Sequence, residues 1–330
     1  MYLCGIDGGG SKTLCLIADE KGNIIGLGKA GPSNISEVGL DGLIRTIVQS
    51  IKSALRGDLK RLDFLCVSLA GVGGRNRWDT VYDLLKKCDL AIKLTLVPDI
   101  YAVLYSATLN GNGIVVISGT GSIVAGIING KLRHRAGGWG YLVDDEGSAF
   151  HIGREAIRRA LRIYDGRDRG DTRLVNVILN HFGVNDLNDL VDLIALGRIK
   201  VKDIASLAPH IINISNDNLT AREIVKKACK ELVKGVMAVY EKMNMDLPII
   251  LGGSLLLKSK RFRDLFIDML KRKVPSVQIV VPKFEPVVGA LIMAYLQAGI
   301  NIGSGQLMIN LEEQIAKEYR NLYISGELHE

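Results

Sequence analysis

The chain has 330 residues, of which 48% are hydrophobic and 23% charged, which is enough for two domains with their own cores and excludes global disorder. Its net charge of +7 is spread along the sequence without a basic block interleaved with aromatic residues, which argues against nucleic-acid binding and suits an anionic ligand such as a nucleotide. The five cysteines form no CxxC pair, no signal peptide is evident, and no apolar run approaches the roughly 20 residues of a membrane span, so we expect a cytoplasmic protein.

The first 112 residues alternate between strand and helix patterns. Apolar runs at 2–7 and 13–19 flank a glycine loop, and a third apolar run follows a turn at 21–23, which together predict an antiparallel meander. Apolar side chains at helical spacing predict an amphipathic helix over 39–56. Strand and helix patterns then alternate, so we expect a mixed sheet with helices on its faces.

The pattern restarts after a turn cluster at 110–113. A strand that ends in a second glycine loop, followed by another strand, repeats the opening of the chain and indicates an internal structural repeat. A long helical stretch follows, and then a strand runs into a third glycine turn. We therefore expect a first domain over 1–112, a second over 113–300 with a helical insertion at about 147–245, and a helical tail over 301–330.

Three glycine-rich turns each lie at the carboxyl end of an apolar strand. Glycine lets backbone N–H groups approach an anion closely, and neighbouring hydroxyls can donate to phosphate oxygens. One such turn is also typical of a strand hairpin, but three in two repeated halves favour phosphate binding, and none fits the Walker A or dinucleotide pattern. The residues concerned are Gly8, Gly9, Gly10, Ser11 and Thr13; Gly119, Thr120, Gly121 and Ser122; and Gly252, Gly253 and Ser254.

Polar residues also occur where strand patterns end. Asp7 precedes the first glycine turn, where a carboxylate beside phosphate makes sense if Mg²⁺, usually bound through water, lies between them; alternatively Asp7 caps the turn. Asp99 separates a strand from a helix, so it is the N-cap of that helix, a general base for an attacking hydroxyl, or both. Asn34 follows the third strand and is either a turn residue or an amide that reaches hydroxyl groups.

The run AGGWGYLVDDEGSAFHIG at 136–153 combines glycines, a tryptophan and three acidic residues before a helix. Sugar hydroxyls need paired acceptors, and an aromatic face packs on the C–H surface of a sugar ring. Trp139, Asp145 and the backbone of Gly138 and Gly140 therefore fit a sugar site. Alternatively, Trp139 is a core residue, and the acidic residues form the first turn of the helix, where they complement its dipole.

These segments together resemble the BadF/BadG/BcrA/BcrD ATPase family of the actin-like ATPase superfamily. The matching runs are GIDGGGSKT, PDIYAV, VISGTGS, GGWGYLVDDEGSAF and ILGGSLL, and they span about residues 1–300. The run GGWGYLVDDEGSA is the most specific, and the chain is most similar to N-acetylglucosamine kinases and archaeal hexokinases. The resemblance implies an α/β fold of two ribonuclease H-like lobes, each a mixed sheet flanked by helices, with ATP in the cleft between them.

The resemblance also implies roles for individual residues. Asp7 would lie near Mg²⁺ and Asp99 would be the base, whereas Lys12 is left outside the site. A helix over 286–298, at the end of the second lobe, would pack back towards the first. The implied nucleotide contacts are Gly9, Gly10, Ser11 and Thr13, then Gly119, Thr120, Gly121 and Ser122, and then Gly252, Gly253 and Ser254 at the adenosine; the implied sugar contacts are Asn34, Asp99, Trp139, Gly140, Asp145 and Ala149.

The prediction is therefore a kinase that uses ATP and Mg²⁺ to phosphorylate the 6-hydroxyl of a hexose or N-acetylhexosamine, with the choice between glucose and N-acetylglucosamine left open. By resemblance it is a homodimer, with no nucleic-acid or membrane partner. One alternative is an ATPase activator of a 2-hydroxyacyl-CoA dehydratase or benzoyl-CoA reductase system. It would need an iron–sulfur cluster, which Cys229, the one cysteine beyond residue 88, cannot supply even in a dimer. The other is a catalytically silent sugar-binding regulator, against which the retained Asp7 and Asp99 argue.

Overall fold

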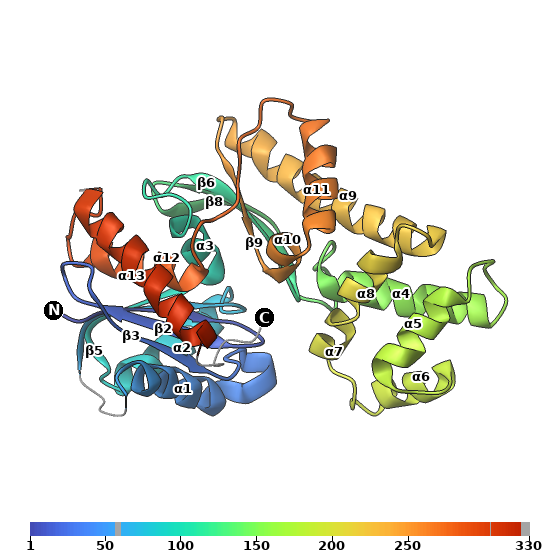
Figure 1. Cartoon of the computed structure of the whole chain (residues 1–330), viewed down its shortest axis with the longest axis horizontal. Helices are drawn as coiled ribbons and strands as arrows, with labels where there is room; N and C mark the ends of the chain where they lie inside the picture. The colour runs from blue at the N-terminus through green and yellow to red at the C-terminus, as the bar shows by residue number, and fades with distance from the viewer. Residues whose placement is uncertain (57–60, 304, 325–330) are drawn as a thin grey trace. The chain divides into compact units, whose positions relative to one another are not determined.

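The chain divides into two compact units (Figure 1). The computed structural model describes residues 1–56, 61–303 and 305–324. Unit 1 comprises Met1–Gly111 and Pro282–Glu330, and unit 2 comprises Asn112–Val281. Part of the predicted tail, residues 304 and 325–330, lies outside the described residues. Within the described ranges, no helix is both long and apolar enough to cross a bilayer.

Unit 1 contains one five-stranded mixed sheet. Its strands are β1 (Leu3–Gly8), β2 (Thr13–Ala18), β3 (Ile24–Ala30), β4 (Leu62–Leu69) and β5 (Ala91–Pro98), and its helices are α1 (Ile35–Ala54), α2 (Arg75–Lys87), α3 (Asp99–Tyr105), α12 (Pro286–Gln297) and α13 (Gly305–Ile324). The strand order is β3-β2-β1-β4-β5; β1 to β3 form the predicted antiparallel meander, and β4 and β5 run parallel to β1. Because side chains alternate across a strand, the sheet faces two cores, one under α1 and α2 and one under α3 and α12.

Unit 2 repeats this sheet. Its strands are β6 (Gly113–Ser118), β7 (Ser122–Ile128), β8 (Lys131–Gly137), β9 (Ile249–Gly252) and β10 (Ile279–Val280), in the order β10-β9-β6-β7-β8. Matching β6 to β10 with β1 to β5 gives the same order and the same strand directions, which confirms the internal repeat predicted from the glycine loops.

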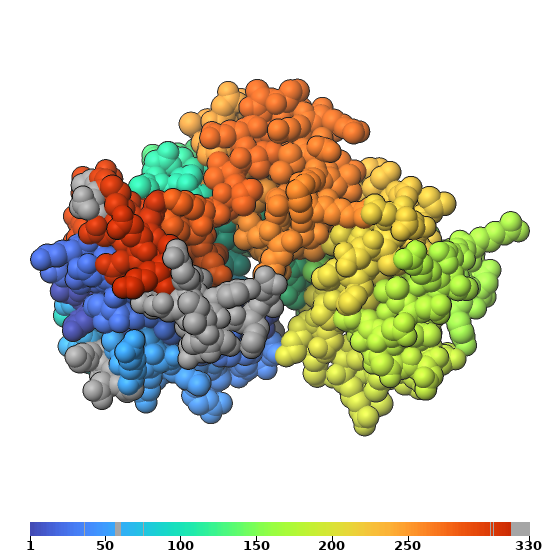
Figure 2. Space-filling view, in the orientation of Figure 1, coloured from blue at the N-terminus to red at the C-terminus, as the bar shows by residue number. Residues whose placement is uncertain are grey.

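A helical block separates β8 from β9, where the helical insertion was predicted. It comprises α4 (Ala149–Tyr164), α5 (Arg173–Phe182), α6 (Leu187–Ala195), α7 (Val201–Ala205), α8 (Ala208–Ile214) and α9 (Leu219–Met243), and the short helices α10 (Ser254–Lys258) and α11 (Lys260–Lys271) follow β9. In the space-filling view, the green and yellow residues of this block form one continuous surface (Figure 2). Its apolar side chains share one core with the sheet of unit 2.

Helix α12 packs back on the sheet of unit 1, as the resemblance implied for a helix over 286–298. Residues 282–300 were assigned to the second domain, but the structure groups them with unit 1. The reason is that α12 is apolar almost all round and must be enclosed, and it is buried against β1, β4 and α3. Two glycines allow this close approach, since a Cβ atom on Gly5 would overlap Leu291 N of α12, and one on Gly289 would overlap Ala102 O of α3.

Helix α1 contains the amphipathic helix that was predicted over 39–56. Its bounds, Ile35–Ala54, join two helices, because the backbone of Gly39, with a φ of 68°, is not helical. The short first helix begins at Ile35, where the Asn34 carbonyl accepts the backbone N–H groups of Glu37 and Val38, and the predicted helix follows Gly39 and ends at Ala54.

The glycine contact between α12 and α3 generates a stability prediction. Gly289→Ala should lower the free energy of unfolding by about 3 kcal/mol or more, because the added methyl would meet backbone atoms that cannot move aside easily. Urea denaturation followed by circular dichroism measures the change. The control is Gly31→Ala, whose Cβ would meet no atom within 4 Å. Equal stability of the two variants would contradict the packing argument.

Candidate active site

Asp7 and Asp99 lie at the same edge of the unit 1 sheet. The parallel register pairs Gly8 with Leu69 and Leu69 with Pro98, so the carboxyl ends of β1, β4 and β5 are level. Asp99 follows Pro98 directly and is the first residue of α3, while Pro98 occupies the cap position, so the N-cap alternative for Asp99 is wrong. The Asp99 carboxylate accepts the backbone N–H of Ile100. The two aspartates are therefore two strands apart at one edge.

Burial makes both carboxylates hard to ionise, and neighbouring negative charges add to this effect at Asp7. The pKa of Asp7 is raised to about 7, chiefly by desolvation and then by the charges of Asp99 and Glu285, while Lys12 lowers it. The pKa of Asp99 is raised to about 6 by desolvation, against the lowering effect of its backbone hydrogen bonds. Both side chains keep some contact with solvent. A carboxylate with a pKa near 6 suits a general base at neutral pH.

Glu285 is the residue at this edge that sequence reasoning missed. It immediately precedes α12, and Lys12 Nζ lies 3.4 Å from its Oε1. The pairing also gives Lys12 a position, because its side chain points to Glu285 from the first glycine turn. A glutamate immediately before Pro286, at the start of an apolar helix, was a signal in the sequence. Its partner Lys12, however, is 273 residues away in sequence, so the pairing could not be predicted from local pattern.

The first glycine turn is closed by backbone hydrogen bonds. The Gly9 N–H donates to Lys12 O at 3.1 Å, and the Ser33 N–H donates to Gly9 O at 3.0 Å, which brings the predicted residue Asn34 to the side of the turn. A Cβ atom on Gly10 would meet nothing within 4 Å, so the turn borders open space there. Of the predicted hydroxyls, Ser11 is exposed, whereas Thr13 is fully buried and its Oγ1 has no hydrogen-bond partner.

The second and third glycine turns adjoin each other in unit 2. The register pairs Ile117 of β6 with Gly252 of β9, so both strands end at the same edge. A Cβ atom on Gly119 would lie 3.5 Å from Ser254 N. Gly253 has a φ of 82°, and a side chain there would overlap Ser118 O, so this turn requires glycine. The structure thus brings together the predicted residues Gly119–Ser122 and Gly252–Ser254.

The predicted sugar-contact residues of unit 2 lie against the second glycine turn. Asp145 has a φ of 62°, and its carboxylate accepts the backbone N–H groups of Gly140 and Ser122. A Cβ atom on Gly121 would lie 2.8 Å from Asp145 Oδ2. Burial raises the pKa of Asp145, and Asp144 adds to the increase. A predicted phosphate residue and a predicted sugar residue are therefore neighbours in this unit.

The structure also locates the acidic residues 144–146, Trp139 and Ala149, for which the sequence left alternatives or predicted a sugar contact. The acidic residues 144–146 do not form the first turn of the helix, because α4 begins at Ala149 with Ser148 as its N-cap. Trp139 is 70% exposed and so is not a core residue, and the Arg135 guanidinium lies 3.7 Å from its ring centroid, covering one face. Ala149 is buried, and its N–H donates to Gly119 O at 2.8 Å.

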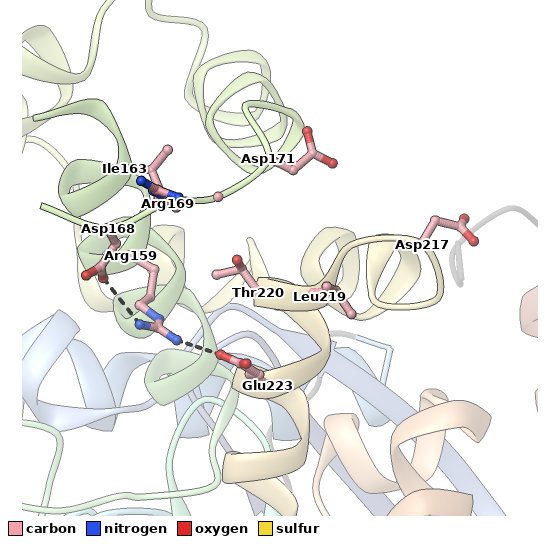
Figure 3. Close-up of a pocket in the computed structure, with 10 residues that line it drawn as sticks. Arg159, Ile163, Asp168, Arg169, Asp171, Asp217, Leu219, Thr220 and Glu223 are labelled. Atoms are coloured by element: carbon pink, nitrogen blue, oxygen red, sulfur yellow. Dashed lines mark hydrogen bonds and ion pairs between the residues drawn. The ribbon is translucent and has the colours of Figure 1, made fainter. Parts of the chain in front are cut away.

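A cavity of about 530 Å³ lies in the helical block, and none of the predicted site residues lines it. Arg159 lines the cavity and pairs with Asp168 at 3.3 Å and with Glu223 at 2.6 Å (Figure 3). These ion pairs neutralise part of the charge that lines the cavity.

The chain is similar to a known protein family, to curated proteins and to solved structures. The model of the BadF/BadG/BcrA/BcrD ATPase family matches residues 4–294. The chain is 31% identical to the N-acetylmuramic acid/N-acetylglucosamine kinase of Clostridium acetobutylicum, covering 89% of this chain and 98% of that protein. It is 28% identical to the glucosamine kinase GspK of Vibrio cholerae, over 89% of this chain and 95% of that protein. A crystal structure from Chromobacterium violaceum, whose name refers to N-acetylglucosamine kinase, has a TM-score of 0.76 at 24% identity, over 89% and 98% of the two chains, which shows the fold.

The raised pKa of Asp99 predicts how stability depends on pH without ligand. The folded chain binds this proton more tightly than the unfolded chain, whose pKa is 3.8, so wild-type stability falls as pH rises from about 4 to above 6. Asp99→Asn carries no charge and should therefore gain about 1–2 kcal/mol over wild type at pH 8, after discounting for its partial exposure, and nothing at pH 4. Chemical denaturation at the two pH values measures this, with the exposed Asp79→Asn as control. A gain that is the same at both pH values would contradict it.

Proposed function

Because the chain belongs to the BadF/BadG/BcrA/BcrD ATPase family, we propose that it is a kinase that transfers the γ-phosphoryl group of ATP to the 6-hydroxyl of a hexose or N-acetylhexosamine. The observation that carries the proposal is the level placement of Asp7 and Asp99 beside the first glycine turn. The amino-sugar kinase names of the Clostridium and Vibrio relatives support the choice of substrate class. Whether the sugar is acetylated stays open.

Asp99 is the general base of the proposed reaction. Its carboxylate takes the proton of the sugar hydroxyl while that oxygen forms a bond to the γ-phosphorus and the bond to the ADP oxygen breaks. Its backbone hydrogen bond to Ile100 fixes the carboxylate at the start of α3. Its pKa of about 6 keeps it mostly unprotonated at neutral pH while leaving it basic enough to accept a proton.

The residues of unit 1 fit a magnesium ion. The charges of Asp99 and Glu285 repel the charge of Asp7, and carboxylate oxygens are ligands that Mg²⁺ prefers. Asp7 would hold the ion mostly through water, since no cluster of three potential ligands in the described residues is arranged to bind a metal directly. When bound, Mg²⁺ neutralises charge on the transferred phosphoryl group.

The remaining predicted residues divide between nucleotide and sugar. For the nucleotide, we propose that Gly9, Gly10 and Ser11 of unit 1, where Gly10 borders open space, and the two glycine turns of unit 2 donate backbone N–H groups to phosphate, with Gly252–Ser254 at the adenosine. For the sugar, we propose Asn34, Trp139, Gly140, Asp145 and Ala149. Trp139 has one ring face covered by Arg135, so the other face is the one that would pack on a sugar.

The activator alternative finds little support in the cysteines. Cys229 is fully buried in α9, its thiol donates to Phe262 O, and burial raises its pKa to about 12. A thiol of this kind is not available as a cluster ligand. The homodimer, which was inferred from the resemblance, and the cytoplasmic location, which was inferred from the sequence, stay predictions.

A coupled ADP-release assay tests the proposed reaction. Across glucose, glucosamine, N-acetylglucosamine and N-acetylmuramic acid, ADP release should depend on at least one sugar, and Asp99→Asn should lower kcat by about 10²- to 10⁴-fold. The wild-type kcat/KM for the sugar should fall as pH drops through about 6, because Asp99 must be unprotonated to act. ADP release that does not depend on sugar and that persists in Asp99→Asn would contradict the kinase proposal.

Gly10→Ala tests the first glycine turn as a phosphate site. The methyl has free space in the ligand-free chain, so the variant should fold as wild type does. It would occupy the space proposed for phosphate, and we expect the KM for MgATP to rise roughly tenfold or more. The matched control is Gly305→Ala at the start of α13, which also meets no atom within 4 Å. An unchanged KM for MgATP would place the phosphate elsewhere.

A further inference from the structure

His151, which no part of the proposed reaction uses, is buried at the base of the Asp145 loop. It lies in the first turn of α4 and is 2% exposed. Its Nδ1 accepts the backbone N–H of Gly147 at 2.7 Å, and its Nε2 lies 2.9 Å from Glu146 Oε2. The other oxygen of Glu146 pairs with Arg154 at 3.0 Å. Both ring nitrogens are therefore committed to the two residues that follow Asp145.

These contacts determine the protonation state of the ring. A backbone N–H can only donate, so Nδ1 must present a lone pair, and the proton of the neutral ring must be on Nε2, where it donates to Glu146. In imidazolium both ring nitrogens carry a proton, so the Nδ1–H of His151 and the backbone N–H of Gly147 would be two donors that face each other. The neighbouring carboxylate of Glu146 favours imidazolium, but burial and the contact with the Gly147 N–H favour the neutral ring. These two effects outweigh the carboxylate, so the ring is neutral.

The charged groups around the ring come from three elements. Glu146 lies in the loop, Arg154 and Glu155 lie on α4, and Lys227 lies on α9. The two carboxylates raise the pKa of His151 and the two cations lower it, while burial is the largest cause and leaves the pKa below its ordinary value of 6.5. The neutral ring is thus the form that matches the folded loop.

The same two residues are also held from the second glycine turn. Ser118 Oγ donates to Gly147 O at 2.8 Å, and Ser122 Oγ donates to Glu146 O at 2.8 Å. The serines thus fix the two carbonyls, and His151 fixes the amide of Gly147 and the carboxylate of Glu146. Asp145 directly precedes this clamped pair and has a left-handed backbone, which only a well-held segment maintains in a residue other than glycine.

We propose that neutral His151 is a positioning residue that holds the Asp145 loop against the second glycine turn, and that protonation of its Nδ1 releases the loop. This inference rests on the proposed function only in assigning Asp145 to the sugar. The loop, its clamp and its release are properties of the ligand-free chain.

Trp139 fluorescence provides a test that needs neither ATP nor sugar. The backbone N–H of Trp139 donates to Asp144 Oδ2 at 3.1 Å, and the backbone N–H of Gly140 donates to the Asp145 carboxylate, so the position of the tryptophan reports on the loop. The chain has two tryptophans, and Trp78→Phe leaves Trp139 as the sole emitter. In this variant, anisotropy should fall in a single transition with a midpoint below pH 6.5, because protonation frees the loop.

Matched variants assign the transition to one ring. His151→Asn places an amide oxygen near Nδ1 and still accepts from Gly147 but cannot titrate, so the transition should vanish. His134→Asn removes a histidine of β8 close to Trp139 in sequence and should leave the transition in place. A transition that survives His151→Asn, that disappears in His134→Asn, or that is absent from the Trp78→Phe parent would overturn the proposal.

Imidazole NMR of the wild-type chain decides the matter even if a variant fails to fold. The His151 resonance should show an unprotonated Nδ1 at pH 8 and titrate below 6.5. Protonated Nδ1, or titration at or above 6.5, would refute the clamp. An intact transition in a chain without sugar-dependent ADP release would refute the proposed function and leave the clamp standing.

Discussion

The close approach of α12 to the unit 1 sheet is the constraint on which the candidate site depends. It is possible because Gly5 and Gly289 have no side chains where β1, α12 and α3 meet. The three elements each carry one carboxylate at the end that points to the same edge: Asp7 near the end of β1, Asp99 at the start of α3 and Glu285 just before α12. A bulkier residue at either glycine would separate these helices from the sheet, and the charges would move with them.

This grouping of carboxylates is costly to a folded chain without ligands. Desolvation raises the pKa of Asp7 to about 7 and that of Asp99 to about 6, and the charges of Asp99 and Glu285 contribute to the increase at Asp7. Ionising these two groups therefore costs the folded chain free energy that it does not cost the unfolded chain. Nearby, the buried hydroxyls of Ser33 and Ser68 lack hydrogen-bond partners in the structure. Neither feature stabilises the fold, and both become understandable if a cation and a polar substrate complete the site.

The parts of the site that sequence could predict are those fixed by local position. Asp7 and Asp99 adjoin strand ends, and the parallel register then places them at the same edge of the sheet, two strands apart. Glu285 was missed because its relation to Lys12 depends on where α12 packs, and α12 follows the second sheet in sequence while it packs on the first. Thr13 was predicted from its place beside the glycines, but strand alternation turns its side chain into the core. Local sequence pattern determines neither which residue Glu285 contacts nor which way the Thr13 side chain points.

The repeat explains why both Asp99 and Glu285 are in unit 1. Asp99 follows β5, and Glu285 follows β10, the strand that corresponds to β5 in the second sheet, so the two residues occupy related points of the repeat. The helices that begin at or directly after these residues, α3 and α12, nevertheless both pack on the first sheet. The edge of the second sheet is consequently formed by two adjoining glycine turns, with Asp145 held against one of them by hydrogen bonds. Glu285 therefore lies at the first sheet, because α12 packs there although it follows the second sheet in sequence. In the proposed reaction, unit 1 contributes the carboxylates for the cation and for the proton, and unit 2 contributes backbone donors to phosphate.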